Sequence, residues 1–106
     1  MQVYARALMV LLLAASSHGA ISQTFPSKPV RLVVPYPPGG NVDIVGRLLV
    51  PKMSEALGQP VVVDYRAGAN GAIGSEHVAR AAPDGYTIII GNSATHVTSQ
   101  LLTRNL

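Results

Sequence analysis

One arrangement, an apolar strand followed by a glycine-rich loop and a helix, occurs three times from residue 30 onward. The predicted strands are β-branched runs at 30–34, 61–63 and 86–90, each bounded by proline, glycine or aspartate. Strands that alternate with helices join by right-handed crossovers into a parallel sheet, and strands that are apolar throughout are buried on both faces. The sequence therefore predicts an α/β fold, a parallel sheet with βαβ crossovers and helices on both faces.

The first helix is predicted from apolar side chains that recur at helical spacing between residues 44 and 57. Asn41 is the expected N-cap, and Asp43 in the first turn suits the positive end of the helix dipole. Gly58 is the expected C-terminal stop. Pro51 lies inside the helix and is expected to kink it or divide it.

Two further helices are predicted. Apolar side chains between Ile73 and Ala82 lie along one helical face. The turn that follows, Pro-Asp-Gly at 83–85, has a physical basis, because proline presets φ and glycine accepts a positive φ. The third helix is expected to begin near His96 or Val97.

The first 22 residues are expected to be an export signal and not part of the fold. One arginine precedes an unbroken apolar run at 8–15, and small and polar residues follow at 16–20. A membrane-spanning helix needs about 20 apolar residues, so this run is too short to be one. A buried N-terminal helix is the alternative. We therefore expect a signal peptide over residues 1–22, its cleavage site left open, and no membrane span in the mature chain.

Composition excludes several classes of partner. The eight basic residues are spread singly along a chain with a net charge of +3, whereas nucleic-acid-binding proteins gather such charges into a patch. We therefore predict no nucleic-acid partner. Cysteine is absent, and the acidic residues show no spacing typical of metal ligands, so neither a metal site nor any other cofactor is predicted.

The three loops after the predicted strands, at 36–40, 66–71 and 91–95, form the candidate ligand site. In open α/β sheets, ligands bind outside the carboxyl ends of the strands. Free N–H groups at a helix N-terminus attract anions, and glycines let an anion approach the backbone closely. Apart from Arg66 at one edge, these loops carry no basic residue. The pattern predicts a site where neutral donors hold a small anion, although glycine-rich loops also serve simply to make tight crossovers.

Enzymatic alternatives are weaker. The glycines over 68–74 superficially resemble a dinucleotide-binding fingerprint, but their spacing differs from G-x-G-x-x-G. Ser93, His96 and Asp84 suggest a hydrolase only as residue types, since nothing resembles a nucleophile elbow. No catalytic residue is predicted, and an exported α/β enzyme is kept as a remote alternative.

Four blocks of sequence together resemble the opening of the solute receptors of tripartite tricarboxylate transporters, also called the Bordetella uptake gene family. They are FPSKPVRLVVPYPPGGNVD at 25–43, LGQPVVV at 57–63, GANGAIG at 68–74 and APDGYT at 82–87. The resemblance implies a two-domain periplasmic binding protein, similar to type II, that closes around its ligand. It also implies a receptor that is not an enzyme, binds a small carboxylate and delivers it to permease subunits in the membrane.

The resemblance also implies where the ligand lies. In this family, one carboxylate is held by backbone amides and bridging waters, without a charged side chain. Carried onto this sequence, the candidate ligand-binding residues are Tyr36, Pro38, Gly39, Gly40, Asn41, Asp43, Gly68, Ala69, Asn92, Ser93, Ala94, Thr95 and His96. The sequence departs from the family at Tyr65, Ala67 and Asn70, where asparagine, proline and glycine are common.

The family's receptors are roughly three times as long as this chain of 106 residues, about two typical domains. We therefore expect residues 23–106 to be the incomplete N-terminal part of the first solute-binding domain. A truncated gene product that binds no ligand is the alternative.

Overall fold

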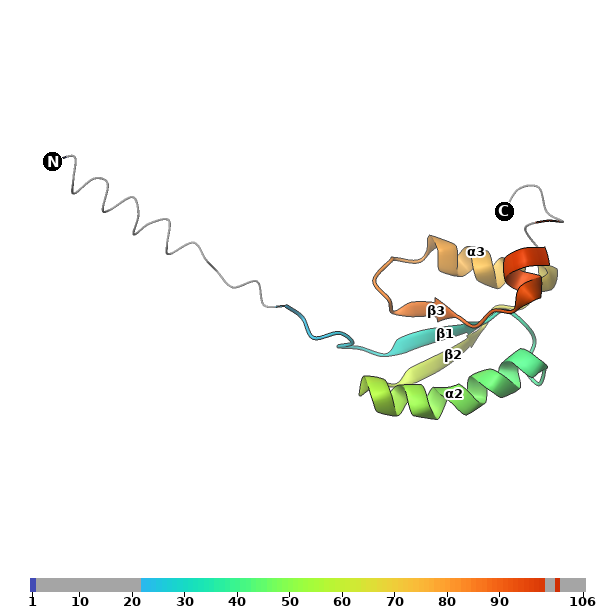
Figure 1. Cartoon of the computed structure of the whole chain (residues 1–106), viewed down its shortest axis with the longest axis horizontal. Helices are drawn as coiled ribbons and strands as arrows, with labels where there is room; N and C mark the ends of the chain where they lie inside the picture. Colours follow the sequence, from blue (N-terminus) through green and yellow to red (C-terminus); the bar gives the residue numbers. More distant parts are fainter. Residues whose placement is uncertain (2–21, 99–100, 102–106) are drawn as a thin grey trace.

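A computed structural model of the chain describes residue 1, residues 22–98 and residue 101. The expected signal peptide, residues 1–22, lies almost entirely outside these residues. The described elements are β1 (Val30–Val34), α2 (Asn41–Leu57), β2 (Val61–Tyr65), the 3₁₀ turn η1 (Ala69–Gly71), α3 (Ala72–Arg80), β3 (Thr87–Ile89) and the π-helical turn η2 (Ala94–Thr98). Strands and helices alternate along the chain (Figure 1), which confirms the predicted α/β class.

The three strands form one parallel sheet in the order β2-β1-β3. Val30 is paired with Val61 on one side, and Arg31 is paired with Thr87 on the other. The second crossover carries the chain past β1, so the strand order reverses direction at β1. Such a reversal opens a crevice at the carboxyl ends of the two strands beside it, here β1 and β3.

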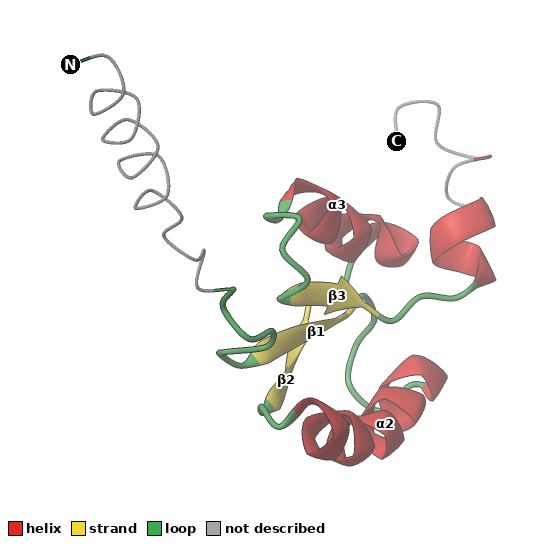
Figure 2. Ribbon diagram, turned by 60° about the vertical axis from the view of Figure 1, so that its left-hand side comes forward, coloured by secondary structure: helices red, strands yellow, loops and turns green. Residues whose placement is uncertain are grey.

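Helix α2 covers one face of the sheet and α3 covers the other (Figure 2). On the α2 face, Val30, Leu32 and Val61 are buried and form the core. Other side chains packed against this core are partly buried: Val50, Met53, Leu57, Tyr86, Ile88 and Ile90. Gly46 faces the same layer, where an added Cβ would lie only 3.8 Å from the Val34 side chain. The apolar spacing of the sequence predicts the buried side of α2 correctly only at Met53 and Leu57. At the start of the helix the prediction is wrong, because Asp43 and Gly46 face the sheet and the apolar side chains there are exposed: Ile44, Val45, Leu48 and Leu49.

Helix α3 approaches the opposite face closely at Gly74. A Cβ at this position would lie 2.8 Å from the Pro35 Cβ and 3.0 Å from the Arg66 carbonyl oxygen. Such distances are shorter than van der Waals contact, so the approach requires glycine. Val33 is fully buried on this face. Since Pro35 begins the loop after β1, the contact at Gly74 also fixes where that loop starts.

The ends of the first helix differ in part from those predicted. Gly58 ends α2 as expected, with φ 67° and an N–H that donates to the Ser54 carbonyl oxygen. The prediction of Asn41 as N-cap is wrong, because Gly40 is the cap and Asn41 is the first helical residue. The helix runs unbroken through Pro51, so its expected division is also wrong. Proline removes one N–H from a helix, and the packing of α2 on the sheet compensates for a single lost bond.

The other boundaries of strands and helices differ from the predicted ones by one to three residues. Strand β2 extends to Tyr65, because the Arg66 N–H still donates to the Val34 carbonyl oxygen, whereas β3 is shorter than the run at 86–90. The turn η2 begins at Ala94, earlier than the expected start near His96 or Val97. None of the described helices combines the length and the hydrophobicity that crossing a membrane requires.

Candidate functional site

The loops after β1 and β3 flank a hollow at the carboxyl edge of the sheet. It encloses about 380 Å³ and is lined by Tyr36, Pro37, Pro38, Gly40, Asn41, Val42 and Asn92. A hollow of about 260 Å³ adjoins it, sharing the last three of these residues and adding Val45, Ile90 and Gly91. We call these two hollows the crevice. It lies at the reversal of strand order, where α/β sheets bind their ligands.

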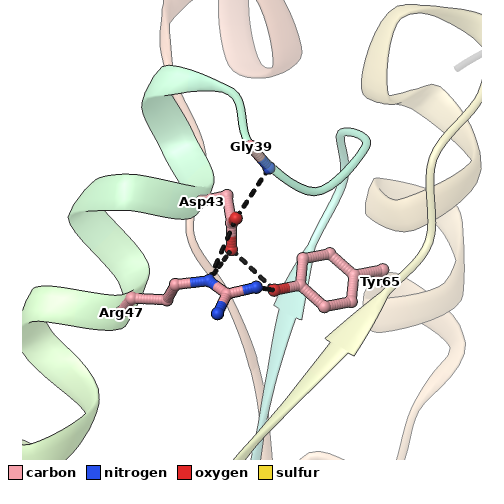
Figure 3. Close-up of polar contacts among 4 residues, drawn as sticks. All are labelled: Gly39, Asp43, Arg47 and Tyr65. Carbon is pink, nitrogen blue, oxygen red and sulfur yellow. Dashed lines mark hydrogen bonds and ion pairs between the residues drawn. The ribbon is translucent and has the colours of Figure 1, made fainter.

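The first loop is held from behind by Asp43, whose side chain is 3% exposed. Its carboxylate accepts a hydrogen bond from the Gly39 N–H at 2.7 Å and another from the Tyr65 hydroxyl at 2.6 Å. Arg47 Nε donates to both carboxylate oxygens at 3.1 Å, and Arg47 Nη2 donates to the Tyr65 hydroxyl at 3.0 Å (Figure 3). The network joins the first loop, α2 and β2.

These contacts determine the charge of the network. The Tyr65 hydroxyl and then the Gly39 N–H, with Arg47 behind them, hold the pKa of the Asp43 carboxyl below its ordinary value against the opposing effect of burial. The same carboxylate raises the pKa of the Tyr65 hydroxyl and of the Arg47 guanidinium. At neutral pH, Asp43 is therefore ionised and Arg47 balances its charge, so the first loop carries no net charge.

The third loop is organised by the Asn92 side chain. Its Oδ1 accepts hydrogen bonds from the Tyr36 hydroxyl at 3.0 Å, the Ala94 N–H at 3.0 Å and the Thr95 N–H at 3.2 Å. Three donors on one atom establish which amide atom is the oxygen. The Nδ2 group has no hydrogen-bond partner in the described part of the chain. Because Asn92 lines both hollows, Nδ2 is the donor that it presents to the crevice.

Thr95 holds the same loop from inside and is only 4% exposed. Its hydroxyl donates to the Asn92 carbonyl oxygen and accepts from the Asn92 N–H, both at 2.9 Å. His96 Nδ1 lies 2.7 Å from the same oxygen. Since the hydroxyl has one hydrogen, His96 Nδ1 is the donor in this third contact. The Thr95 hydroxyl is therefore engaged within the loop.

The second loop meets the other two at Gly71. With φ 88° this residue needs glycine, and an added Cβ would collide with the Thr95 methyl group and lie 3.3 Å from the Tyr36 hydroxyl. Asn70 has φ 55°, a left-handed conformation that asparagine tolerates better than most residues. This tolerance explains how asparagine stands where the family commonly has glycine.

The predicted site residues divide into three groups. Those that line the crevice are Tyr36, Pro38, Gly40, Asn41 and Asn92. Gly39 and Asp43 bond to each other behind the first loop. The others are not among the described residues that line the crevice: Gly68, Ala69, Ser93, Ala94, Thr95 and His96.

Sequence reasoning missed Arg47 and Tyr65. Arg47 is four residues after Asp43, the spacing of an ion pair along a helix, and this signal was available in the sequence. Tyr65 is 22 residues from Asp43, and only the pairing of β2 with β1 brings it near.

The described residues that line the crevice are all uncharged. They include no arginine, lysine, aspartate, glutamate or histidine. The crevice offers the Asn92 amide and the N–H groups at the start of α2, which have no partners within the helix. In the described part of the chain, no three histidine, cysteine or acidic residues lie close enough together to hold a metal ion. Neutral donors at a helix N-terminus suit an anion.

Comparison with known proteins gives a consistent family. The sequence profile of the tripartite tricarboxylate transporter family receptor matches residues 45–105. A UPF0065 protein of Bordetella bronchiseptica is 45% identical over 107 residues, an alignment that covers 99% of this chain and 32% of that protein.

Solved structures agree with this similarity. MatC from Rhodopseudomonas palustris, solved with bound malate, matches with a TM-score of 0.74 and 41% identity over 77% of this chain and 28% of MatC. Rpa4515 of R. palustris, solved with adipate, matches with a TM-score of 0.62 and 45% identity over 63% of this chain and 22% of that one. The chain thus spans about a third or less of the length of these proteins.

Proposed function

Because this chain belongs to the family of tripartite tricarboxylate transporter receptors, we propose that it supplies one wall of a periplasmic solute-binding site. In this proposal the crevice between the first and third loops takes a carboxylate group of a small organic acid. The observation that carries it is the lining of the crevice, which offers neutral donors and no charged side chain among the described residues.

The physical argument concerns how neutral groups hold an anion. The Asn92 Nδ2 group and the N–H groups at the start of α2 can donate to carboxylate oxygens, and the helix dipole favours negative charge there. Asp43 does not oppose the anion, because Arg47 pairs with it at 3.1 Å behind the loop. A carboxylate held in this way leaves again easily, which suits a receptor that must release its ligand.

The ligand class follows from the relatives. One similar structure holds malate and another adipate, and both are dicarboxylates of different length. We propose that this chain recognises the carboxylate that the two acids share. The part of the ligand that differs would then contact the remainder of the longer receptor, since this chain covers 28% and 22% of those two proteins.

The biological setting is part of the same proposal. Residues 1–22 would direct export, residues 23–106 would form the N-terminal part of the first domain, and the loaded receptor would deliver its ligand to membrane permease subunits. Nothing in this role needs a catalytic residue, and the crevice provides neither a nucleophile paired with a base nor a metal cluster among the described residues.

The test is Asn92→Asp, with malate titrated into the wild-type and variant chains. Aspartate keeps an oxygen for the three donors and remains a good helix cap, so the loop keeps its structure. It replaces the Nδ2 donor with a carboxylate oxygen that repels the ligand. We expect saturable, weak malate binding by the wild-type chain and at least about tenfold weaker binding by the variant.

Gln59→Glu is the matched control, since it makes the same amide-to-acid change just before β2, at the amino edge of the sheet. It should leave malate binding unchanged. Equal affinity of the wild-type and Asn92→Asp chains would contradict the proposed site. A wild-type chain that shows no saturable binding would favour the alternative of a product that binds no ligand.

A further inference from the structure

Strand β2 forms one edge of the sheet (Figure 1) and has no strand partner on its outer side in the described residues. The Val30 N–H donates to the Pro60 carbonyl oxygen, and the Arg66 N–H donates to the Val34 carbonyl oxygen. Since backbone groups alternate along a parallel strand, the N–H and C=O groups of Val61, Val63 and Tyr65 point outward. The Val61 N–H is bonded to Ser54 Oγ, which leaves Val63 and Tyr65 with open groups.

Among the described residues, α3 packs mainly on β3 and β1, so the same face of the sheet is more exposed over β2. Side chains alternate along a strand, so Val62 lies on this face together with Asp64. Val62 is 52% exposed, and its paired neighbour Arg31 has a side chain that is 53% exposed. The five residues that line a shallow hollow of about 250 Å³ here are Arg31, Val62, Val63, Asp64 and Arg66.

A second hollow of about 380 Å³ lies beside the first and extends onto α3, and we call the two hollows together the strip. The second hollow is lined by Arg66, Ile73, Glu76, His77, Arg80 and Ala81, so Arg66 belongs to both hollows. Ile73 is an exposed apolar side chain. The strip therefore combines an open strand edge, two exposed aliphatic side chains and a row of arginines.

The strip has fewer carboxylates than arginines, so its ion pairs are incomplete. Arg66 Nε lies 3.1 Å from Asp64, and Arg31 Nη1 lies 3.5 Å from the same carboxylate oxygen. Arg80 pairs with Glu76 on α3. Two acids thus serve three arginines, and Arg31 is the most loosely held. A carboxylate that approached from outside would give Arg31 and Arg66 a partner each.

We propose that the β2 edge, with Arg31 and Arg66 beside it, is a docking site for an extended, acidic segment of another protein, which adds as a further strand. The open groups of Val63 and Tyr65 would bond the backbone of that segment. Its acidic side chains, at alternate positions, would lie on the face of Val62 and meet the two arginines. This surface is separate from the crevice, since no residue lines both.

The probe is the synthetic peptide acetyl-Thr-Glu-Val-Glu-Val-Thr-amide, titrated into the ¹⁵N-labelled chain. We expect saturable shifts of the Val63 and Tyr65 amides. The same peptide with lysine in place of glutamate should give none. Arg66→Glu should weaken binding about two- to fivefold, the range expected of an exposed ion pair.

Val63→Pro tests the backbone contribution. The Val63 N–H points outward, so proline removes a donor for the peptide but no bond to β1, and edge strands tolerate proline at such positions. Peptide binding should be lost. Val63→Thr, which keeps the N–H and a β-branched shape, is the control and should still bind. If Val63→Pro does not fold, Arg66→Glu decides the question.

Three outcomes would overturn the proposal. The first is equal binding of the lysine and glutamate peptides, and the second is full binding by a folded Val63→Pro chain. The third is a wild-type chain that forms dimers without peptide, if Val63→Pro abolishes them. In that case the occupant of the β2 edge is a second copy of this chain.

Discussion

The first and third loops both face the crevice, yet they are supported in different ways. The first loop depends on a charged network, in which Asp43 bonds Gly39, Arg47 and Tyr65. The third loop depends on neutral groups, chiefly the Asn92 amide and the Thr95 hydroxyl. Both nevertheless present neutral donors to the crevice. In the proposed anion site, a buried charge would thus position the donors without opposing the anion, because its partner lies behind the loop.

The two supports also differ in how far they reach. The network at Asp43 connects residues from the first loop, α2 and β2, and it forms only when the sheet has assembled. The bonds at Asn92 lie mostly within four residues of sequence, and the Tyr36 hydroxyl is the long-range exception. We therefore expect the first loop to respond to acid through Asp43.

The largest effect should come from Gly71→Ala, which disturbs both loops at once. Alanine at φ 88° is strained, and its Cβ would press on Thr95 and Tyr36. We expect a loss of roughly 2–4 kcal/mol in the free energy of unfolding, measured by urea denaturation. Gly39→Ala is the control, because it has a similar φ of 92° but no atom within 4 Å of the new Cβ. It should cost only about 1–2 kcal/mol. Equal losses would mean that Gly71 does not join the loops.

Asp43→Asn should break the first loop alone. The amide cannot pair with Arg47, so we expect a loss of stability between those of Gly71→Ala and Asn92→Ala. Amide shifts should change at Gly39 and Gly40 and stay constant at Thr95. Large changes at both loops would contradict the separation of the two supports.

The dependence of stability on pH should distinguish the same variant. The pKa of Asp43 is lowered on folding, so its contribution is complete above the unfolded value of about 3.9 and is lost as pH falls through the folded value. The pKa of Tyr65 is raised, so its contribution is present below about pH 10 and is lost as pH rises through the folded value. Denaturation midpoints recorded across this range should fall at both ends, and the fall in acid should be smaller in Asp43→Asn.

Asn92→Ala should have a smaller effect, centred on the third loop. Alanine removes the acceptor for the Ala94 and Thr95 N–H groups, and loss of such a cap costs about 1 kcal/mol. It also removes the acceptor for the exposed Tyr36 hydroxyl, which can bond to water instead. Amide shifts should change at Ala94 and Thr95 and stay constant at Asp43. A loss of stability as large as that of Asp43→Asn would contradict this ranking of the two supports.

The smallest effect is expected from Lys52→Ala. Lys52 and Glu55 form an ion pair on α2 whose side chains are 84% and 78% exposed, and their Nζ and Oε2 atoms are 3.9 Å apart. Exposed pairs of this kind contribute less than about 0.5 kcal/mol. The variant calibrates the others, since a larger loss would show that ion pairs on α2 matter outside the network at Asp43.

Local sequence patterns predict much of this fold. The strand at 30–34, the stop at Gly58 and the parallel α/β class all follow from apolar runs and from proline and glycine positions. Contacts between distant residues do not follow in this way. The bond between Tyr65 and Asp43 depends on the strand order, which the repeated pattern leaves open. Asn92 was recognised as a donor, but its capping role required knowing that η2 begins at Ala94.

The central claim is that the two loops together form one carboxylate site, and a per-residue titration of the ¹⁵N-labelled chain with malate tests it most directly. The account predicts that amides of the first loop, at Gly39 and Gly40, and of the third loop, at Asn92 and Thr95, shift along one curve with a single dissociation constant. Different constants for the two loops would contradict it. So would shifts gathered around Arg66 and Arg80, because malate would then be bound by surface arginines and not by the crevice.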